Sequence, residues 1–346
     1  MLEEIPAKSA EQSMRERPNM YIGRFMKLFP GLFMDCIRSC KTEAVLFSVA
    51  ILCGNKFSID VSSDRDMAPF LISITEHVGV FLFLHSKMLT VSTDSLEISS
   101  DNGKWHFHKG ELQENKNEVK DIRRLTLDFV FDSDVFRDTN IDFHTLSEEF
   151  GQLAILHSKA EILVKDLRGK YLCQEYYSFP DGIFYLYDRL KSEVLGRPKF
   201  EIKFEGKIGE RQYQIAIGYR TDWYPPPSIL SYSNEIFTSA GGSLIDGVLQ
   251  GLITGCRRYT KVNAPGRYKI KSRKFANGLI LVCAVKGEDF MYAGSTKEKL
   301  ENKEVEKEIK KQVGKLVFDY LSSNKEISET FLFRFDEAQL TSKMFS

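Results

Sequence analysis

The stretch SYSNEIFTSAGG, from Ser231 to Gly242, decides how this sequence is expected to fold. Its first half continues an alternating segment that starts at Ile229, and this alternation predicts a strand. Its two closing glycines precede SLIDGVLQGLITGCRRY (243–259), which is expected to be a helix. A strand, a turn and a long helix are therefore predicted in this order, and the neighbouring segments can be placed around them.

Further strands are predicted on both sides of this stretch. They are FEIKFEG (200–206), YQIAIGYR (213–220) and GLILVCAVKG (278–287). TDWYPPPS (221–228) is a connection, because three consecutive prolines can continue neither a helix nor a central strand. A closing helix is expected from about Thr296, with one apolar face made by Val305, Ile309, Val313 and Val317.

The N-terminal half shows a similar mixture of patterns after a polar arm at 1–24. Residues 31–53 lack glycine and proline beyond the first position, which predicts a buried helix. LSEEFGQLAILHS (146–158) has helical spacing, and a short helix is expected from Asp181 to about Lys191. Strands are predicted at 56–63, 89–94, 96–102, 104–110 and 125–132, with a hairpin turn at Asp101-Asn-Gly103, and a strand–turn–strand at 160–179 around Arg168-Gly169.

The chain is long enough for two domains, because 346 residues exceed the roughly 100–200 that one domain usually takes. The character of the sequence changes near residue 192, so we expect domains at 1–191 and 192–346. Strands interleaved with helices in each half predict an α+β fold, in which each sheet is covered by helices on one side.

Composition excludes few functions. Lys+Arg and Asp+Glu both count 48, so bulk charge favours neither nucleic acid nor a membrane surface. The six cysteines show no Cys-x-x-Cys pair, and Cys36 and Cys40 have no neighbouring ligands for zinc, so no metal site is expected. The N-terminus is polar and acidic, unlike a signal peptide, and no apolar run is long enough for a membrane span. A cytoplasmic protein is expected.

Four segments, in this order, resemble the N-terminal half of the B subunits of gyrase and topoisomerase IV, which are type IIA DNA topoisomerases. They are RERPNMYIG (15–23), FVFDSDVF (129–136) with the following helix and LVKDLRG (163–169), SYSNEIFTSAGG (231–242), and the run from Gly278-Leu279 to AGSTKEKL (293–300).

This resemblance implies a two-layer Bergerat-type ATPase domain over 1–191 and a ribosomal-protein-like transducer domain over 192–346. In that family ATP clamps two subunits together, and a transducer lysine senses the terminal phosphate. A metal-binding cleavage domain normally follows, and because this chain ends at Ser346, that domain is expected to be absent.

The hydrolytic residues of the family do not match. Its helix reads E-x-x-D-N, with a glutamate as general base and an asparagine as magnesium ligand. Alignment from Gly31-Leu32 places Arg38 at the glutamate and Thr42 at the asparagine. Arginine stays cationic and cannot accept a proton. A shift by one turn offers Asp35 or Glu43, but neither has an Asp-Asn pair with it.

The nucleotide-holding loops are also poorly matched. The family's adenine element is D-x-G-x-G, and the nearest segment here, Asp64-Arg-Asp66-Met-Ala-Pro69, lacks glycine. Of the glycine-rich lid over the phosphates only His77-Val-Gly79-Val80 is left, and a lone histidine such as His77 is usually structural. Most backbone donors for phosphate are therefore expected to be missing.

Two features of the C-terminal half are candidates for ligand binding. Lys297, with Thr296, occupies the position of the family's nucleotide-sensing lysine, although an ordinary solvent-facing lysine at a helix start is the alternative. A basic stretch runs from Cys256 to Lys274, and it could contact DNA phosphates or form a solvated helix end. Its cations are Arg257, Arg258, Lys261, Arg267, Lys269, Lys271, Arg273 and Lys274.

The sequence thus predicts a topoisomerase B-subunit-like module that has lost ATP hydrolysis, a pseudo-ATPase without a catalytic residue or cofactor. Duplex DNA, a topoisomerase subunit or a second copy of the chain are the partners considered, and no membrane is expected. Two alternatives stay open. One is an ATP- and magnesium-binding subunit fragment with divergent motifs, and the other is a protein-interaction domain without any connection to DNA.

Overall fold

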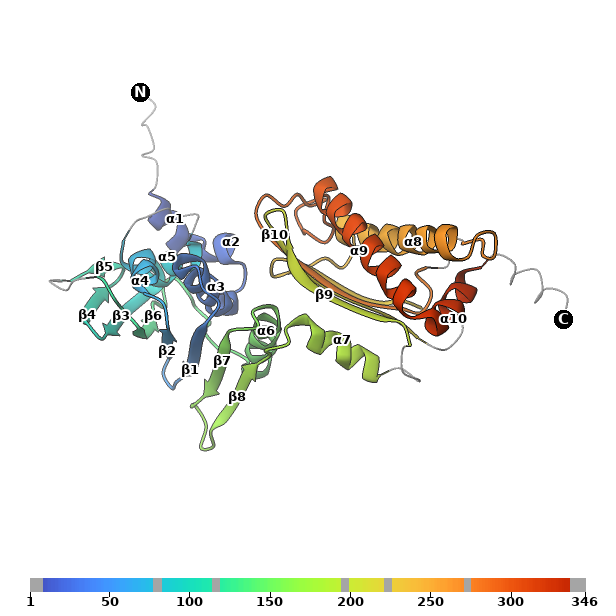
Figure 1. Cartoon of the computed structure of the whole chain (residues 1–346). Coiled ribbons are helices and arrows are strands. Elements are labelled where there is room, and N and C mark those ends of the chain that lie inside the picture. The colour runs from blue at the N-terminus through green and yellow to red at the C-terminus, as the bar shows by residue number, and fades with distance from the viewer. Residues whose placement is uncertain are drawn as a thin grey trace, which may run out of the picture. The chain divides into compact units, whose positions relative to one another are not determined.

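The computed structural model describes residues 9–76, 83–113, 119–193, 199–220, 226–270 and 275–336. The chain divides into two compact units, Met1–Pro180 and Asp181–Ser346, each with its own sheet (Figure 1). Both sheets are mixed and both carry helices, as an α+β fold requires.

The first unit is built on an eight-stranded sheet with the order β5-β4-β3-β6-β2-β1-β7-β8. All neighbours are antiparallel except β1 and β7, which run parallel and place Val49 opposite Val164. The strands are β1 (Val45–Ile51), β2 (Lys56–Ser63), β3 (Thr93–Ser100), β4 (Gly103–His108), β5 (Glu111–Leu112), β6 (Arg124–Phe131), β7 (Glu161–Asp166) and β8 (Cys173–Ser178).

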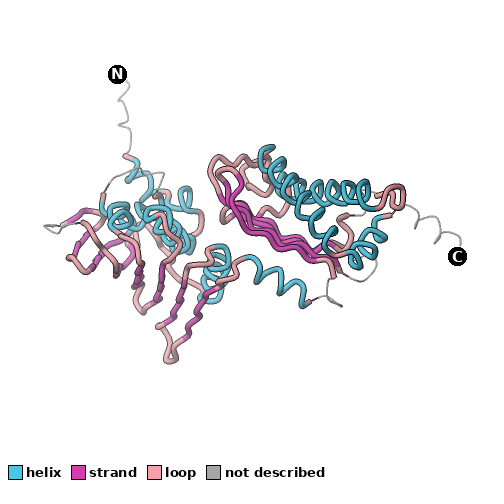
Figure 2. The backbone as a smooth tube through the Cα atoms, viewed as in Figure 1, coloured by secondary structure: helices cyan, strands magenta, loops and turns pink. Residues whose placement is uncertain are grey.

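The helices of the first unit lie on one side of this sheet (Figure 2). Phenylalanines fill the layer between them, with Phe29 of the third helix tilted against Phe57 of β2 at a ring distance of 5.2 Å. Such aromatic contacts add to the burial of apolar surface. The helices are α1 (Ala10–Glu16), α2 (Pro18–Ile22), the 3₁₀ turn η1 (Phe25–Lys27), α3 (Leu28–Cys40), α4 (Ala68–Thr75), α5 (Leu84–Ser92) and α6 (Phe143–Leu156).

The single helix predicted at 31–53 is wrong in its second half. Helix α3 ends at Cys40, because Lys41 takes a left-handed conformation with φ of 50°, and β1 then begins at Val45. The apolar run was too uniform to separate a buried helix from the buried strand that follows it. The strand predicted at 89–94 is also mostly wrong, since α5 continues to Ser92 and β3 starts at Thr93.

The other predicted strands of this half are confirmed. The hairpin of β3 and β4 turns at Asp101 and Asn102, and Ser100 pairs with Gly103. The strand–turn–strand around Arg168 is the pair β7 and β8, where Asp166 faces Cys173. In β4, β6 and β7 buried positions alternate with more exposed ones, so the period of two was sufficient to predict these strands. Strand β8 has no buried position and was predicted from its place after the turn at Arg168-Gly169.

The second unit has a five-stranded sheet with the order β12-β11-β13-β10-β9, in which only β11 and β13 run parallel. Its strands are β9 (Glu201–Ile208), β10 (Arg211–Tyr219), β11 (Ser228–Ser233), β12 (Ile236–Phe237) and β13 (Leu279–Lys286). Its helices are α7 (Ile183–Ser192), α8 (Ser243–Asn263), α9 (Lys303–Ser323) and α10 (Lys325–Phe335).

Helix α7 contacts β13 and β10, and the division between the compact units therefore falls before it, at Pro180. The change in sequence character near residue 192 comes after this helix. The closing helix begins at Lys303, later than the expected Thr296, because residues from Met291 to Glu301 form a loop. Its predicted apolar face is confirmed, since Val305, Ile309, Val313 and Val317 are all fully buried.

Helices α8 and α9 approach each other through glycines. Gly247, Gly251 and Gly255 are spaced four residues apart on α8 and face successive turns of α9. A Cβ atom on Gly255 would lie 2.6 Å from the Cβ atom of Val317 and 2.7 Å from the carbonyl oxygen of Gly314. The backbones are therefore too close for any side chain at this position.

We predict that Gly255→Val destabilises the protein by about 1–3 kcal/mol or more, because overpacking must push a helix backbone away. The measurement is urea unfolding followed by circular dichroism. Thr254→Ala, at an exposed position of the same helix, is the matched control and should change the stability by no more than about 0.5 kcal/mol. Equal stability of Gly255→Val and the native protein would contradict the close packing.

Candidate functional site

The end of α3 carries the residues that the resemblance aligned with the catalytic base and the magnesium ligand. Arg38 lies on the last turn and is exposed. Thr42 lies beyond the helix end, and its Oγ1 accepts a hydrogen bond from the backbone N–H of Ala44 at 3.1 Å. Neither residue supplies a carboxylate or an amide oxygen at this position.

The two acidic alternatives point elsewhere. Glu43 also lies beyond the helix, and its Oε1 is 3.1 Å from Nδ1 of the buried His157 at the end of α6. Asp35 is 1% exposed and faces α5. The two carboxylates thus belong to different contacts, and the structure does not bring them together as a base and a metal ligand.

Asp35 binds the N-terminus of α5. Its Oδ2 accepts hydrogen bonds from the backbone N–H of Ser86 at 2.8 Å and from Oγ of Ser86 at 3.2 Å. The residue at the N-cap of α5 is Phe83, which makes no capping bond of its own. A side chain distant in sequence therefore satisfies a donor that the helix leaves open. Sequence reasoning considered Asp35 only as a base, since nothing in the local pattern reveals this tertiary contact.

The segment aligned with the adenine element is a turn between β2 and α4. Oδ1 of Asp66 accepts from the backbone N–H groups of Ala68 at 3.0 Å and Ile122 at 2.9 Å. Burial works to raise the pKa of Asp66, but these backbone hydrogen bonds outweigh it, so that the pKa lies below its ordinary value. The Asp66 carboxylate thus already accepts hydrogen bonds from the protein backbone. His77, Gly79 and Val80 lie outside the described residues.

The RERPNMYIG segment forms α1, α2 and the turn between them. Arg15 donates from Nη1 to the carbonyl oxygen of Val91 and from Nη2 to Oδ2 of Asp132, both at 2.5 Å. Asp132 is 4% exposed. Burial works to raise its pKa, but the backbone N–H of Asp134 and the Arg15 guanidinium together lower it. This arginine ties the N-terminal helices to the end of α5 and the end of β6.

The loop with Lys297 is held against the SYSNEIFTSAGG segment. The backbone N–H of Leu300 donates to the carbonyl of Gly241 at 3.1 Å, and the N–H of Ala240 donates to that of Glu298 at 3.0 Å. Gly242 has φ of 107°, and a Cβ atom there would lie 2.1 Å from the carbonyl oxygen of Leu300. Only glycine fits this approach, which accounts for the second glycine of the pair.

Lys297 and Thr296 are exposed on this loop. Lys297 has a left-handed φ of 56°, and its Nζ lies 5.7 Å from the centre of the Tyr292 ring. The lysine is thus on a loop and not at a helix start, but it faces solvent, as the alternative expected.

The described cations of the basic stretch are exposed, but not all of them are unpaired. Arg267 forms an ion pair with Glu329 of α10 at 2.8 Å, and the Arg258 guanidinium lies 4.4 Å from the centre of the Phe318 ring on α9. Arg257 lies 3.5 Å from the carbonyl oxygen of Ile270. Lys261 and Lys269 complete the described set, whereas Lys271, Arg273 and Lys274 lie outside the described residues.

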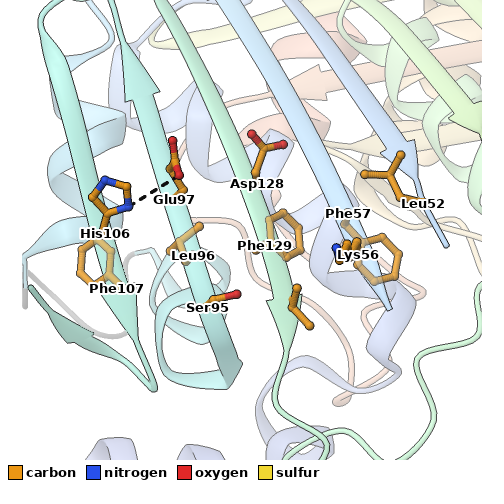
Figure 3. A pocket seen from close by; sticks show the side chains of 11 residues that line it. Leu52, Lys56, Phe57, Ser95, Leu96, Glu97, His106, Phe107, Asp128 and Phe129 are labelled. Atoms are coloured by element: carbon orange, nitrogen blue, oxygen red, sulfur yellow. Dashed lines mark ion pairs between the residues drawn. The ribbon is translucent and has the colours of Figure 1, made fainter. Parts of the chain in front are cut away.

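A hollow of about 420 Å³ lies at strands β2, β3, β4 and β6 of the first unit (Figure 3). Glu97, at its rim, accepts from Lys104 at 2.8 Å and lies 3.6 Å from Nδ1 of His106. These are exposed cross-strand pairs, which are screened by solvent and add little to the stability of the sheet. Among the described residues no group of three or more His, Cys, Asp or Glu side chains could hold a metal ion.

Comparison with known proteins agrees with this architecture. The family model described as DNA gyrase B matches residues 185–343. The DNA gyrase B protein of Streptococcus pneumoniae serotype 4 is 25% identical over 92% of this chain and 55% of its own length. The DNA gyrase B protein of Synechocystis is 25% identical over 66% of this chain and 22% of its own length. The chain thus spans about a fifth to about half of these curated relatives.

Two solved structures share the fold along almost the entire chain. The 43K ATPase domain of Thermus thermophilus gyrase B, solved with an aminocoumarin, has a TM-score of 0.78 at 16% identity and covers 96% of both chains. The ATP-binding domain of Francisella tularensis topoisomerase IV has a TM-score of 0.70 at 18% identity, over 96% of this chain and 97% of its own.

The chain therefore has the fold of the ATPase and ATP-binding domains of these two structures. More specifically, it resembles gyrase B, and the resemblance drawn from the four sequence segments is confirmed. No helix in the described parts of the chain is long and apolar enough to cross a membrane.

We predict that Arg15→Met destabilises the protein by about 2–3 kcal/mol at pH 7, because a buried carboxylate loses a charged partner. The folded pKa of Asp132 is lowered, so its stabilising effect is present above the unfolded value of about 3.9 and is lost as the pH falls through the folded value. The difference between variant and native protein should therefore shrink on acidification.

Urea unfolding at a series of pH values between about 7 and 3 checks this. Arg17→Met is the matched control, because Arg17 belongs to the same segment but is exposed. A stability difference for Arg15→Met that stays constant over this pH range would show that the pair with Asp132 is not its source.

Proposed function

We propose that this protein is a gyrase B-like module that does not hydrolyse ATP and acts by binding other macromolecules. The end of α3 is the observation that carries this proposal. Where the family has a glutamate and an asparagine, the chain has the exposed Arg38 and, beyond the helix, Thr42 with its hydroxyl engaged by the backbone of Ala44.

The chemistry explains why this position matters. Hydrolysis needs a group that can accept a proton from water, and a guanidinium cannot do so. Magnesium prefers oxygen ligands, and no carboxylate or amide of α3 is available in this place. Glu43 is paired with His157 and Asp35 is buried against Ser86, so neither alternative supports the missing roles. The residues present do not fit a bound magnesium nucleotide.

The competing function is an ATPase with divergent residues. Its support is the resemblance to ATPase domains and the position of Lys297 on a loop fixed by Gly241 and Gly242. Such an ATPase would need a general base from residues that do not align with the catalytic glutamate of the family. Under the proposed function, Lys297 is an inherited position and Thr296 its neighbour, without a role in turnover.

We expect no steady ATP hydrolysis above the buffer rate and nucleotide affinity weaker than about 1 mM. The measurements are phosphate release and calorimetric titration with a non-hydrolysable ATP analogue, both in the presence of magnesium. Lys297→Ala is the matched variant, and it should behave like the native protein. Magnesium-dependent turnover that disappears in Lys297→Ala would overturn the proposal in favour of the divergent ATPase.

Duplex DNA is the partner that the charge distribution favours. Arg257 and Lys261 are exposed on the last turns of α8, and α9, which packs alongside, exposes Lys307, Lys311 and Lys315 at a spacing of four residues. Residues four apart lie on one face of a helix, so these lysines form a stripe. Cations arranged in this way can neutralise phosphates without reading the base sequence.

Binding to DNA should weaken as salt increases, with a log–log slope of about −0.9 for each phosphate contacted. The triple variant Arg257→Glu, Lys261→Glu and Lys269→Glu should reduce the affinity at least tenfold, measured by fluorescence anisotropy with a labelled duplex. The control reverses three exposed cations of the first unit, Lys56, Arg124 and Lys170. Equal losses in both variants, or no binding by the native protein at low salt, would favour the DNA-independent interaction domain.

A further inference from the structure

We propose that the N-terminus of α5 is an oxyanion site that the protein fills with its own Asp35 carboxylate, and that this side chain excludes free phosphate groups from it. The inference rests on the proposed function and extends it. Under this proposal nucleotide binding is prevented in two ways: by the Asp35 carboxylate at the N-terminus of α5 and by the altered residues at the end of α3.

The first step is the chemistry of the helix end. The first N–H groups of a helix have no partner within the helix, and together with the helix dipole they attract anions. In α5 the N-cap residue Phe83 cannot cap these groups. The N–H and the hydroxyl of Ser86 are both directed at one carboxylate oxygen of Asp35, at 2.8 and 3.2 Å. This is the contact that a phosphate oxygen would make.

The second step is that Asp35 has unused capacity. Within the described part of the chain, its Oδ1 is buried without a hydrogen-bond partner, and so is Nδ1 of His85, the residue before Ser86. The two atoms are 3.7 Å apart. Buried polar atoms normally have partners, so an unsatisfied donor and acceptor beside each other are unusual for a site that serves stability alone. Helix end, hydroxyl and imidazole converge on one small polar site.

Helix α3 packs against His85 at the same place. The ring of His85 lies directly over Gly31 of α3, where a Cβ atom would come within 2.1 Å of it. The ring therefore occupies the space that a side chain at position 31 would take, and it packs α5 against α3. The His85 side chain is 24% exposed, so the site lies one side chain below the surface.

Charge decides what the site can accept. A phosphate at the N-terminus of α5 would lie within a few ångströms of the Asp35 carboxylate in surroundings with little water, where like charges repel strongly. Both cannot occupy the site as anions. Removal of the carboxylate should leave the Ser86 donors and the imidazole of His85 facing a vacated space, which is suited to a phosphate oxygen.

The test is calorimetric titration with inorganic pyrophosphate at constant ionic strength. We expect Asp35→Ala to bind pyrophosphate at least tenfold more tightly than the native protein. The matched control is Asp142→Ala, because Asp142 also caps a helix, accepting from the N–H of Thr145 at 2.8 Å, but at the exposed start of α6. Oγ1 of Thr145 also donates to Asp142, at 2.5 Å, but both residues are exposed. That variant should gain no affinity, because water and salt screen an anion at this exposed helix start.

The proposal is overturned if folded Asp35→Ala binds pyrophosphate no better than the native protein, or if Asp142→Ala gains as much. Circular dichroism establishes that each variant is folded. Should Asp35→Ala fail to fold, Asp35→Ser, which keeps a hydroxyl near Ser86, is judged by the same two criteria. Turnover of ATP by the native protein would refute the proposed function, and it is a separate readout from pyrophosphate binding by these variants.

Discussion

The contact between Asp35 and Ser86 is the constraint around which the helices of the first unit are arranged. A carboxylate that is 1% exposed must receive hydrogen bonds, or the cost of its burial would be several kcal/mol. The N-terminus of α5 supplies them, so α3 and α5 must stay in contact at this point. The ring of His85 over Gly31 makes a second contact between the same two helices, one turn earlier on α3.

A shared fold does not require shared chemistry. The segments that resemble gyrase B mostly have structural roles in this chain. Arg15 ties helices to the sheet, and Gly242 permits the approach of Leu300. Such residues are needed for the fold whether or not a nucleotide binds.

Much of the fold could be predicted from the sequence, because most strands alternate regularly and the apolar face of α9 repeats at helical spacing. The boundary between α3 and β1 could not, since both are buried and apolar, and only the left-handed turn at Lys41 separates them. The hydrogen-bond partner of Asp35 could not be predicted either. It depends on a contact between residues 35 and 86, for which a single sequence carries no signal.

The glycine contacts between α8 and α9 have a mechanical consequence. Two helices whose backbones touch along successive turns behave as one stiff rod, because neither can rotate without lifting the other. The loop with Lys297 leads directly into α9 and is bonded to the glycines that open α8. We therefore expect a displacement of that loop to move both helices together.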